Sequence, residues 1–252
     1  MRPRAVVTGA AARVGRAIAL ELARSGFDVA IHHRSRPDAA AEVARACAEH
    51  GSDAFVVAAA LDDEAGCTTL VDAVKARWDQ VHLLVNNASR FEPVPFEQID
   101  AAAWDAMLAV NLRAPFLVSR GLLPLLERGR ASDLGGPADQ GGCVVHLCDI
   151  GAERPVSGYA HYSVSTAGLV MLVRAMAVEL APRVRTVGVS PGQVVWPESY
   201  DDALRARLAK RIPMGRAGTA EDVARLVRFV ATEGFYLNGA VLPIDGGLSA
   251  RY

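Results

Sequence analysis

The sequence predicts a single α/β domain in which helices cover both faces of a doubly wound, Rossmann-type parallel sheet of about seven strands. Short apolar segments alternate with amphipathic ones along the 252 residues, and this alternation is typical of strand–helix–strand units joined by right-handed crossovers. The first apolar segment runs into a glycine turn that opens a helix, as in dinucleotide-binding folds. The length suits one large domain, so we assign residues 1–252 to it.

Apolar spacing assigns the elements in chain order. Short apolar runs such as Ala5-Val6-Val7 predict strands, and apolar residues at helical spacing, such as Val14, Ile18 and Leu22, predict helices. The expected elements are strand 4–8, helix 14–25, strand 27–33, helix 37–50, strand 53–59, helix 63–78, strand 81–85, helix 100–128, strand 142–148, helix 159–181, strand 183–189, helix 219–232 and strand 239–244.

Two segments interrupt the alternation. The polar, glycine-rich segment 129–141 predicts a surface loop, because the alternation resumes after it. The segment 193–217 is the longest interruption near the expected ligand side, where substrate lids often lie. We therefore predict a lid near 193–217.

Composition excludes several classes of function. The net charge of −1 leaves no broad basic surface for nucleic acid. The spacing of the four cysteines fits neither a metal site nor a redox pair, so we expect no metal. We find no signal peptide and no membrane-spanning run, and we expect a reduced, cytoplasmic protein that does not bind membranes.

The glycine turn carries the first functional prediction. The motif runs from Thr8 to Gly15 and directly follows the first apolar run. Gly9 permits the tight turn, and Gly15 lets the helix that begins near Val14 lie close to the neighbouring strand. Such a helix directs its backbone N–H groups and positive dipole end at an anion. We expect Thr8, Gly9, Val14 and Gly15 to contribute to binding a dinucleotide pyrophosphate.

The end of the second strand indicates which dinucleotide is bound. A carboxylate at this place would hold the 2′-hydroxyl of NAD, and the sequence has none there. His33, Arg34 and Ser35 instead offer donors and positive charge to a 2′-phosphate. These residues favour NADPH, the alternative being an ordinary basic surface turn.

Six separated motifs together resemble one family. They stand in the order typical of short-chain dehydrogenases/reductases, and the resemblance covers essentially the whole chain. Within that family the chain is most similar to the pteridine and dihydromonapterin reductases. The six motifs are Thr8–Gly15, Asn86-Asn87-Ala88, Asn111, Tyr162, Ser190-Pro191-Gly192 and Asp245-Gly246-Gly247.

The resemblance implies roles on the cofactor side. Arg13 stands where most members have a second loop glycine, and in pteridine reductases the matching arginine lies near the cofactor phosphates and the pterin. Asn87 and Ala88 are similar to residues that close over the cofactor. Pro191 and Gly192 resemble the turn over the nicotinamide.

The resemblance also implies a pterin site. Ser89 and Phe91 match positions that line it, with the phenyl ring stacked on one face of the pterin. Asp149 stands where most members have a serine that binds a substrate carbonyl, and pteridine reductases have aspartate. A carboxyl group can pass a proton to a ring nitrogen, which a serine does poorly. Tyr162 would be the proton donor, and Asn111 resembles the asparagine that anchors a water in the proton relay.

The chain departs from the family at one catalytic position. The family has a lysine four residues after the tyrosine, and Thr166 stands there. That lysine holds the nicotinamide ribose and lowers the tyrosine pKa, which is about 10 when unperturbed. Thr166 carries no charge, so three alternatives stay open: another proton path, a substrate that needs little acid catalysis, or NADPH binding without turnover.

The function predicted from the sequence is NADPH-dependent reduction of a dihydropterin to a tetrahydropterin. The alternatives are a ketoreductase of the same family and a catalytically impaired, NADPH-binding regulatory or scaffold protein. We expect a homotetramer, because the long helices of this family pair between subunits, and here these are the patterns at 100–128 and 159–181.

Overall fold

Seven parallel strands form one sheet at the centre of the molecule. The computed structural model describes residues 2–196 and 200–250, and the strand order is β3-β2-β1-β4-β5-β6-β7. Every neighbouring pair is parallel, which confirms the predicted fold class. The strands are β1 (Arg4–Val7), β2 (Asp28–His33), β3 (Phe55–Ala58), β4 (Leu83–Asn86), β5 (Cys143–Leu147), β6 (Arg185–Pro191) and β7 (Val241–Ile244).

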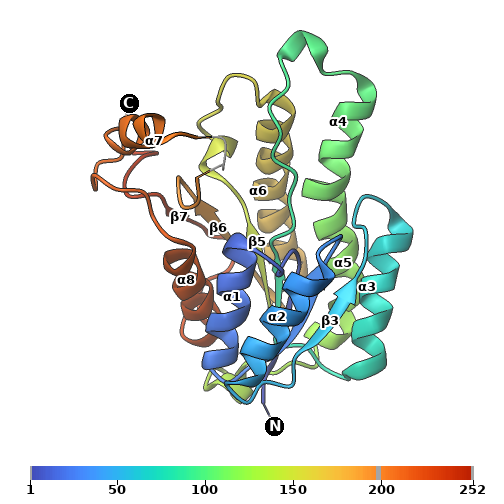
Figure 1. Cartoon of the computed structure of the whole chain (residues 1–252). Helices are drawn as coiled ribbons and strands as arrows, with labels where there is room; N and C mark the ends of the chain where they lie inside the picture. The colour runs from blue at the N-terminus through green and yellow to red at the C-terminus, as the bar shows by residue number, and fades with distance from the viewer. Residues whose placement is uncertain (1, 197–199, 251–252) are drawn as a thin grey trace.

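Helices pack on both faces of this sheet (Figure 1). Helices α1, α2 and α8 cover one face, and α3, α5 and α6 cover the other. The chain crosses from β1 to β2 in one direction and later returns to place β4 on the other side of β1, so the strand order reverses at β1. The helices are α1 (Arg13–Arg24), α2 (Pro37–Ala48), α3 (Glu64–Arg77), α4 (Ala101–Leu108), α5 (Ala114–Leu126), α6 (Ala160–Leu180), α7 (Asp202–Ala209) and α8 (Ala220–Thr232).

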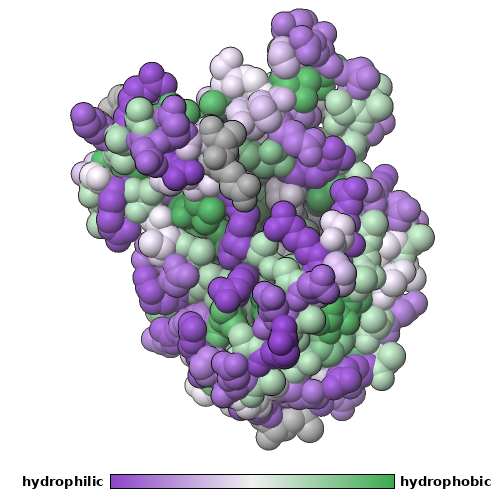
Figure 2. Space-filling model, in the orientation of Figure 1, coloured by the Kyte–Doolittle hydropathy of each residue, from purple (hydrophilic) through white to green (hydrophobic). Residues whose placement is uncertain are grey.

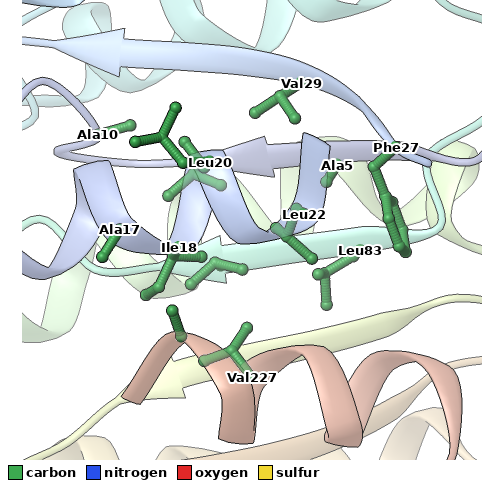
Figure 3. Close-up of a cluster of buried hydrophobic side chains, with 14 of the residues drawn as sticks. Ala5, Ala10, Ala17, Ile18, Leu20, Leu22, Phe27, Val29, Leu83 and Val227 are labelled. Atoms are coloured by element: carbon green, nitrogen blue, oxygen red, sulfur yellow. The ribbon is translucent and has the colours of Figure 1, made fainter. Parts of the chain in front are cut away.

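Helix α1 shows how the apolar spacing builds the core. Its residues Ile18 and Leu22 are fully buried, four positions apart on one helix face. Figure 3 shows these side chains between the strands and α8, from which Val227 points toward α1. Burying two such side chains stabilises the fold by about 3–6 kcal/mol relative to leaving them exposed. This packing holds the N-terminus of α1 at the carboxyl end of β1.

The structure refines three predictions. The helix expected at 100–128 is divided, because a π-helical turn, η2 (Ala109–Arg113), separates α4 from α5. The predicted lid contains α7, whose first turn is capped by Asp201 through the Leu204 N–H. The predicted loop at 129–141 contains the short helix η3 (Ala131–Leu134). Residues 197–199 of the predicted lid lie outside the described residues.

Two helical stretches are long and apolar enough to cross a membrane by length and composition alone. They are Ala101–Leu126 and α6, and 50% and 44% of their most apolar windows are buried inside the fold. Helices that pack on a sheet pass the same test, so this finding is weak support for a membrane span.

Candidate functional site

The carboxyl ends of the strands surround a cleft of about 630 Å³, within the range of sites for small ligands and cofactors. In parallel α/β sheets, ligands bind outside these strand ends, where the strand order reverses. Figure 2 shows the molecule hollowed between the part that carries α7 and the end of α4. The residues that line the cleft are Gly9, Ala12, Arg13, Val14, Gly15, His32, Arg34, Arg36, Leu61, Asp62, Asn87, Ala88, Ser89, Arg90, Phe91, Val110, Leu147, Cys148, Asp149, Tyr162, Pro191, Gly192, Gln193, Val194, Val195 and Tyr200.

Hydrogen bonds tie the glycine turn to the loop after β4. Thr8 is buried, and its Oγ accepts from the backbone N–H groups of Asn87 and Ala88, each over 2.9 Å. The Asn87 side-chain amide donates to the carbonyl oxygens of Thr8 (2.8 Å) and Gly9 (3.2 Å). Thr8 and Asn87 therefore shape the turn, and Gly9 and Ala88 form part of the cleft wall.

Glycine is required at two places in this turn. Gly9 has a φ of +65°, which side chains rarely adopt. A Cβ on Gly15 would lie 2.2 Å from the Gly9 carbonyl oxygen and 2.5 Å from the Asn87 side-chain nitrogen. The start of α1 therefore approaches the turn as closely as backbone atoms allow. This cradle fits the pyrophosphate of a dinucleotide.

Arg13 stands at the mouth of the same turn. It has a φ of +52°, a conformation that costs a non-glycine residue about 1–2 kcal/mol. Its Nη2 donates to the Val195 carbonyl oxygen over 3.1 Å, so the guanidinium bridges the glycine turn and the segment after β6. The structure thus places Arg13 at the cleft.

The end of β2 differs in detail from the predicted arrangement. Arg34 lines the cleft, whereas His33 and Ser35 are not among the lining residues. The His33 ring is buried, and its Nδ1 accepts from the Arg36 backbone N–H over 3.2 Å. Arg36 lines the cleft instead. Positive charge therefore stands at the cleft beyond β2, on Arg34 and on Arg36 of the same basic run, a residue that was not among the predicted site residues.

The side chains of Asp149 and Tyr162 meet in the cleft. The Tyr162 hydroxyl donates to Oδ2 of Asp149 over 3.0 Å, and Oδ1 of Asp149 accepts from the Gly151 N–H over 2.6 Å. Asp149 leaves the carboxyl end of β5 and also caps the short helix η4 (Ile150–Ala152). Tyr162 stands in the first turn of α6 and is 8% exposed.

Burial shifts both groups of this pair toward their neutral forms. It raises the pKa of Asp149, although the two hydrogen bonds that the carboxylate accepts oppose the shift. Burial, followed by the charge of Asp149, raises the pKa of Tyr162 well above its usual value. Tyr162 is therefore protonated near neutral pH, and the pair can hold a proton for transfer.

The rings of Phe91 and Tyr159 pack beside this pair. The ring of Phe91 stacks on that of Tyr159, with centroids 4.5 Å apart and planes 17° from parallel. The ring of Tyr162 meets Phe91 edge-on, at 4.8 Å. One face of the Phe91 ring is thus covered by Tyr159. Phe91 is still 49% exposed and lines the cleft, as does Ser89.

Asn111 lies in the π-helical turn η2, and its side chain braces the loop after β4. Its Oδ1 accepts from the Arg90 N–H over 2.8 Å, and its Nδ2 donates to the Arg90 carbonyl oxygen over 3.0 Å. Nδ2 also donates to the Ser165 hydroxyl on α6, over 3.1 Å. Asn111 is 3% exposed and does not line the cleft. Its amide therefore holds the loop that carries Ser89 and Phe91.

The structure does not bring Thr166 to the cleft. Its side chain is 2% exposed, and its hydroxyl lies 3.2 Å from the Tyr162 carbonyl oxygen and 3.1 Å from that of Ser163. The hydroxyl is thus directed at its own helix, and Thr166 is not among the residues that line the cleft. Of the described residues, no lysine lines the cleft.

The structure also locates the predicted Pro191 and Gly192 and the four cysteines. Pro191 and Gly192 line the cleft beyond the end of β6. The cysteines are free and buried. In the part of the chain that the structure describes, no three histidine, cysteine, aspartate or glutamate side chains gather as a metal site would require.

Comparison with known proteins places this arrangement among reductases. A family model described as Enoyl-(Acyl carrier protein) reductase matches residues 9–249. Pteridine reductase 1 of Leishmania tarentolae is 30% identical over 98% of this chain and 96% of its own length. The 3-oxoacyl-(acyl-carrier-protein) reductase FabG of Staphylococcus aureus is 28% identical over 98% of both chains. The solved structure of a short-chain dehydrogenase/reductase from Serratia marcescens is 30% identical, covers 98% of both chains and has a TM-score of 0.88.

Proposed function

The chain belongs to the short-chain dehydrogenase/reductase family of NAD(P)-dependent oxidoreductases, and we propose that it uses NADPH to reduce a dihydropterin to a tetrahydropterin. When bound, the reduced nicotinamide supplies a hydride to a carbon of the pterin ring. The two-electron reduction is complete when one proton reaches a ring nitrogen. The protein must therefore position a flat heterocycle and deliver that proton.

The contact between Asp149 and Tyr162 is the observation that carries the proposal. A carboxyl group stands at the end of β5, 3.0 Å from the tyrosine hydroxyl, where a simple carbonyl reductase of this family would have a serine. A carboxyl group can donate a proton to a ring nitrogen or accept one from it. The exposed part of the Phe91 ring offers an apolar surface for the heterocycle in the same cleft.

The proton comes from the state of the pair in which Asp149 is neutral. If Tyr162 gave up its proton beside an ionised Asp149, two negative charges would lie in contact in a poorly solvated site. With Asp149 protonated, Tyr162 can pass its proton to the substrate and take the proton of Asp149 in turn. The pair then ends with one negative charge, on Asp149, which solvent reprotonates after product leaves. No lysine lines the cleft in the described part of the chain, which is consistent with this route.

The positive charge at the end of β2 supports NADPH over NADH. Arg34 and Arg36 both line the cleft beyond this strand, where the 2′-position of the adenosine ribose lies in dinucleotide-binding folds. Among the described residues, neither Arg34 nor Arg36 forms an ion pair with an acidic side chain. A guanidinium in this position would bind a 2′-phosphate through charge-assisted hydrogen bonds.

A single-turnover experiment tests the proposal. The enzyme with bound NADPH is mixed with dihydrobiopterin under anaerobic conditions, and the nicotinamide absorbance is followed. Loss of the absorbance band with formation of tetrahydrobiopterin supports the proposal. Tight binding of NADPH with no loss of absorbance contradicts it.

Two alternatives each have one observation in their favour. The similarity to the Staphylococcus aureus FabG protein favours a reductase of carbonyl substrates, and Asp149 in place of serine argues against it. The position of Thr166, turned away from the cleft, favours a protein that binds NADPH without turnover. A 3-oxoacyl thioester as substrate in the same experiment distinguishes the first alternative from the pterin reductase.

We also propose that the protein is a cytoplasmic homotetramer. Apolar side chains at seven-residue spacing form an exposed stripe on α6: Val164 is 48% exposed, Met171 is 59% exposed and Val178 is 82% exposed. Phe116 on α5 is 43% exposed. An exposed apolar surface of this kind is typical of a protein–protein interface, and an identical subunit is the occupant we propose.

A further inference from the structure

The loop between β3 and α3 forms one wall of the cleft and is anchored from two sides. Leu61 and Asp62 line the cleft, and the loop follows the strand next to β2. In dinucleotide-binding folds this side of the sheet receives the adenosine half of the cofactor. Two side chains that the proposed chemistry does not use, His32 and Arg113, bind the backbone of this loop.

His32 joins the loop to the glycine turn. Its Nδ1 accepts from the Gly9 N–H over 3.0 Å, so its other ring nitrogen, Nε2, carries the proton and donates to the Ala59 carbonyl oxygen, also over 3.0 Å. The ring is 2% exposed at the back of the cleft. The neutral ring therefore bridges two separate segments that would face one dinucleotide.

Arg113 holds the same loop from the opposite side. Its Nη2 donates to the Asp62 carbonyl oxygen over 2.6 Å. Arg113 is the last residue of the π-helical turn η2. In the same turn, the side chain of Asn111 forms hydrogen bonds with both the backbone N–H and the carbonyl oxygen of Arg90. Turns of this kind occur often at functional sites. In this chain η2 anchors the loop after β3 through Arg113 and the loop after β4 through Asn111.

We propose that His32 and Arg113 are positioning residues for the adenosine half of the bound dinucleotide. Both act by holding the loop 59–63. Their hydrogen bonds go to Gly9, Ala59 and Asp62, and not to Asp149 or Tyr162. The inference rests on dinucleotide binding, which is part of the proposed function, but it does not depend on the pterin substrate. Loss of either anchor should weaken nucleotide binding and leave proton transfer unchanged.

Arg113→Met is the direct test, because Arg113 is exposed and its replacement should not disturb folding. The probe is 2′,5′-ADP, which contains the adenosine half alone, and its Kd is measured by calorimetry. We expect Arg113→Met to raise this Kd about three- to tenfold, the effect of one lost hydrogen bond. Turnover at saturating NADPH should stay within about twofold. Arg113→Lys, which keeps a terminal donor, should restore most of the affinity.

Arg120→Met is the matched control. Arg120 lies on the adjoining helix α5, its guanidinium is 5.9 Å from the Phe116 ring, and among the described residues it forms no hydrogen bond with the loop 59–63. The control should bind 2′,5′-ADP as the wild type does. Equal affinity of Arg113→Met and wild type would overturn the inference, and so would equal losses in Arg113→Met and Arg120→Met. Because the readout is nucleotide affinity, a failure of the pterin proposal would leave this result unaffected.

Two substitutions of His32 distinguish its hydrogen bond to the Ala59 carbonyl oxygen from its hydrogen bond to the Gly9 N–H. His32→Gln retains an amide donor near the position of Nε2, and His32→Leu removes both contacts. We expect His32→Gln to bind 2′,5′-ADP more tightly than His32→Leu does. Amide hydrogen exchange should show faster exchange in the loop 59–63 for both Arg113→Met and His32→Leu. Amide hydrogen exchange in this loop at the wild-type rate in both variants would contradict the inference.

Discussion

The Tyr162 hydroxyl donates a 3.0 Å hydrogen bond to Oδ2 of Asp149, and no lysine approaches the pair among the described residues. Burial raises the pKa of both groups. A neighbouring lysine would have favoured the ionised tyrosine, whereas a buried carboxyl group favours its own neutral form. The proposed route of the proton follows from this difference.

Substitution of Thr166 by lysine distinguishes proton supply by neutral Asp149 from acid catalysis that depends on a lysine near Tyr162. A cation at this position would favour the ionised forms of Asp149 and Tyr162 and lower the pKa of each. If neutral Asp149 supplies the proton, Thr166→Lys should not increase kcat/KM at pH 7 by more than about threefold. Thr166→Ser, which keeps a hydroxyl, is the control. A gain of tenfold or more would show that the native site is impaired by the absence of lysine.

Arg34 should determine the preference for NADPH. Arg34→Ala should weaken NADPH binding about 10- to 150-fold, because it removes a charged donor from the 2′-phosphate. The Kd of NADH should change by less than about twofold. Fluorescence titration of both cofactors checks the result. Equal weakening for the two cofactors would mean that Arg34 does not contact the 2′-phosphate, and Arg36→Ala applies the same test to the neighbouring cation.

Buried histidines should make the fold sensitive to acid. Burial lowers the pKa of His32 to about 4 and that of His146 to about 3. The unfolded chain therefore takes up protons first, and the stability that the neutral rings provide is lost as pH falls from about 6.5 toward these values. Between the unfolded and the folded pKa, each ring reduces the free energy of unfolding by about 1.4 kcal/mol for every unit by which the pH falls.

His146→Leu should reduce this slope. His146 is fully buried on β5, and its Nε2 has no hydrogen-bond partner in the described structure, so leucine removes an unsatisfied donor without leaving a large cavity. The unfolding free energy from urea titrations at several pH values is the measurement. His50→Leu, at an exposed histidine, should leave the slope as in wild type. An unchanged slope in His146→Leu would contradict the account.

The proposed assembly depends on the stripe on α6. Val178→Glu places a charge at its most exposed apolar position, where burial of an unpaired charge in an interface would be costly. We expect the variant to elute as a smaller species than wild type in size-exclusion chromatography with light scattering. Phe96→Glu, at an exposed phenylalanine on η1 (Phe96–Gln98), serves as control. A monomeric wild-type protein would refute the assembly directly.

Periodicity and turn residues predicted most of the fold. The strands and long helices follow from apolar spacing, and the glycine turn marks the N-terminus of α1. The π-helical turn at Asn111 could not be predicted, because it depends on the tertiary contacts of Asn111 with Arg90 and Ser165. Helix α7 was missed because its apolar pattern is weak and it has no buried residues.

The site was predicted in part for similar reasons. Arg13, Arg34, Asp149 and Tyr162 stand in local motifs, and the structure brings all four to the cleft. His33 and Thr166 stand in the same motifs, yet their side chains turn into the protein. His32 alternates with His33 along β2, so only the register of the sheet decides which ring lies at the cleft. Sequence alone does not specify that register.

The pH dependence of a single turnover tests the central claim most directly. The rate of nicotinamide oxidation by dihydrobiopterin is measured for wild type and Asp149→Asn. We predict that the wild-type rate is highest at low pH and falls as pH rises through the raised pKa of Asp149, because only the neutral carboxyl group supplies the proton. Asp149→Asn should be slower by about 10²- to 10⁴-fold and should lack this pH dependence. A pterin reduction rate that rises with pH, or that survives in Asp149→Asn, would contradict the account.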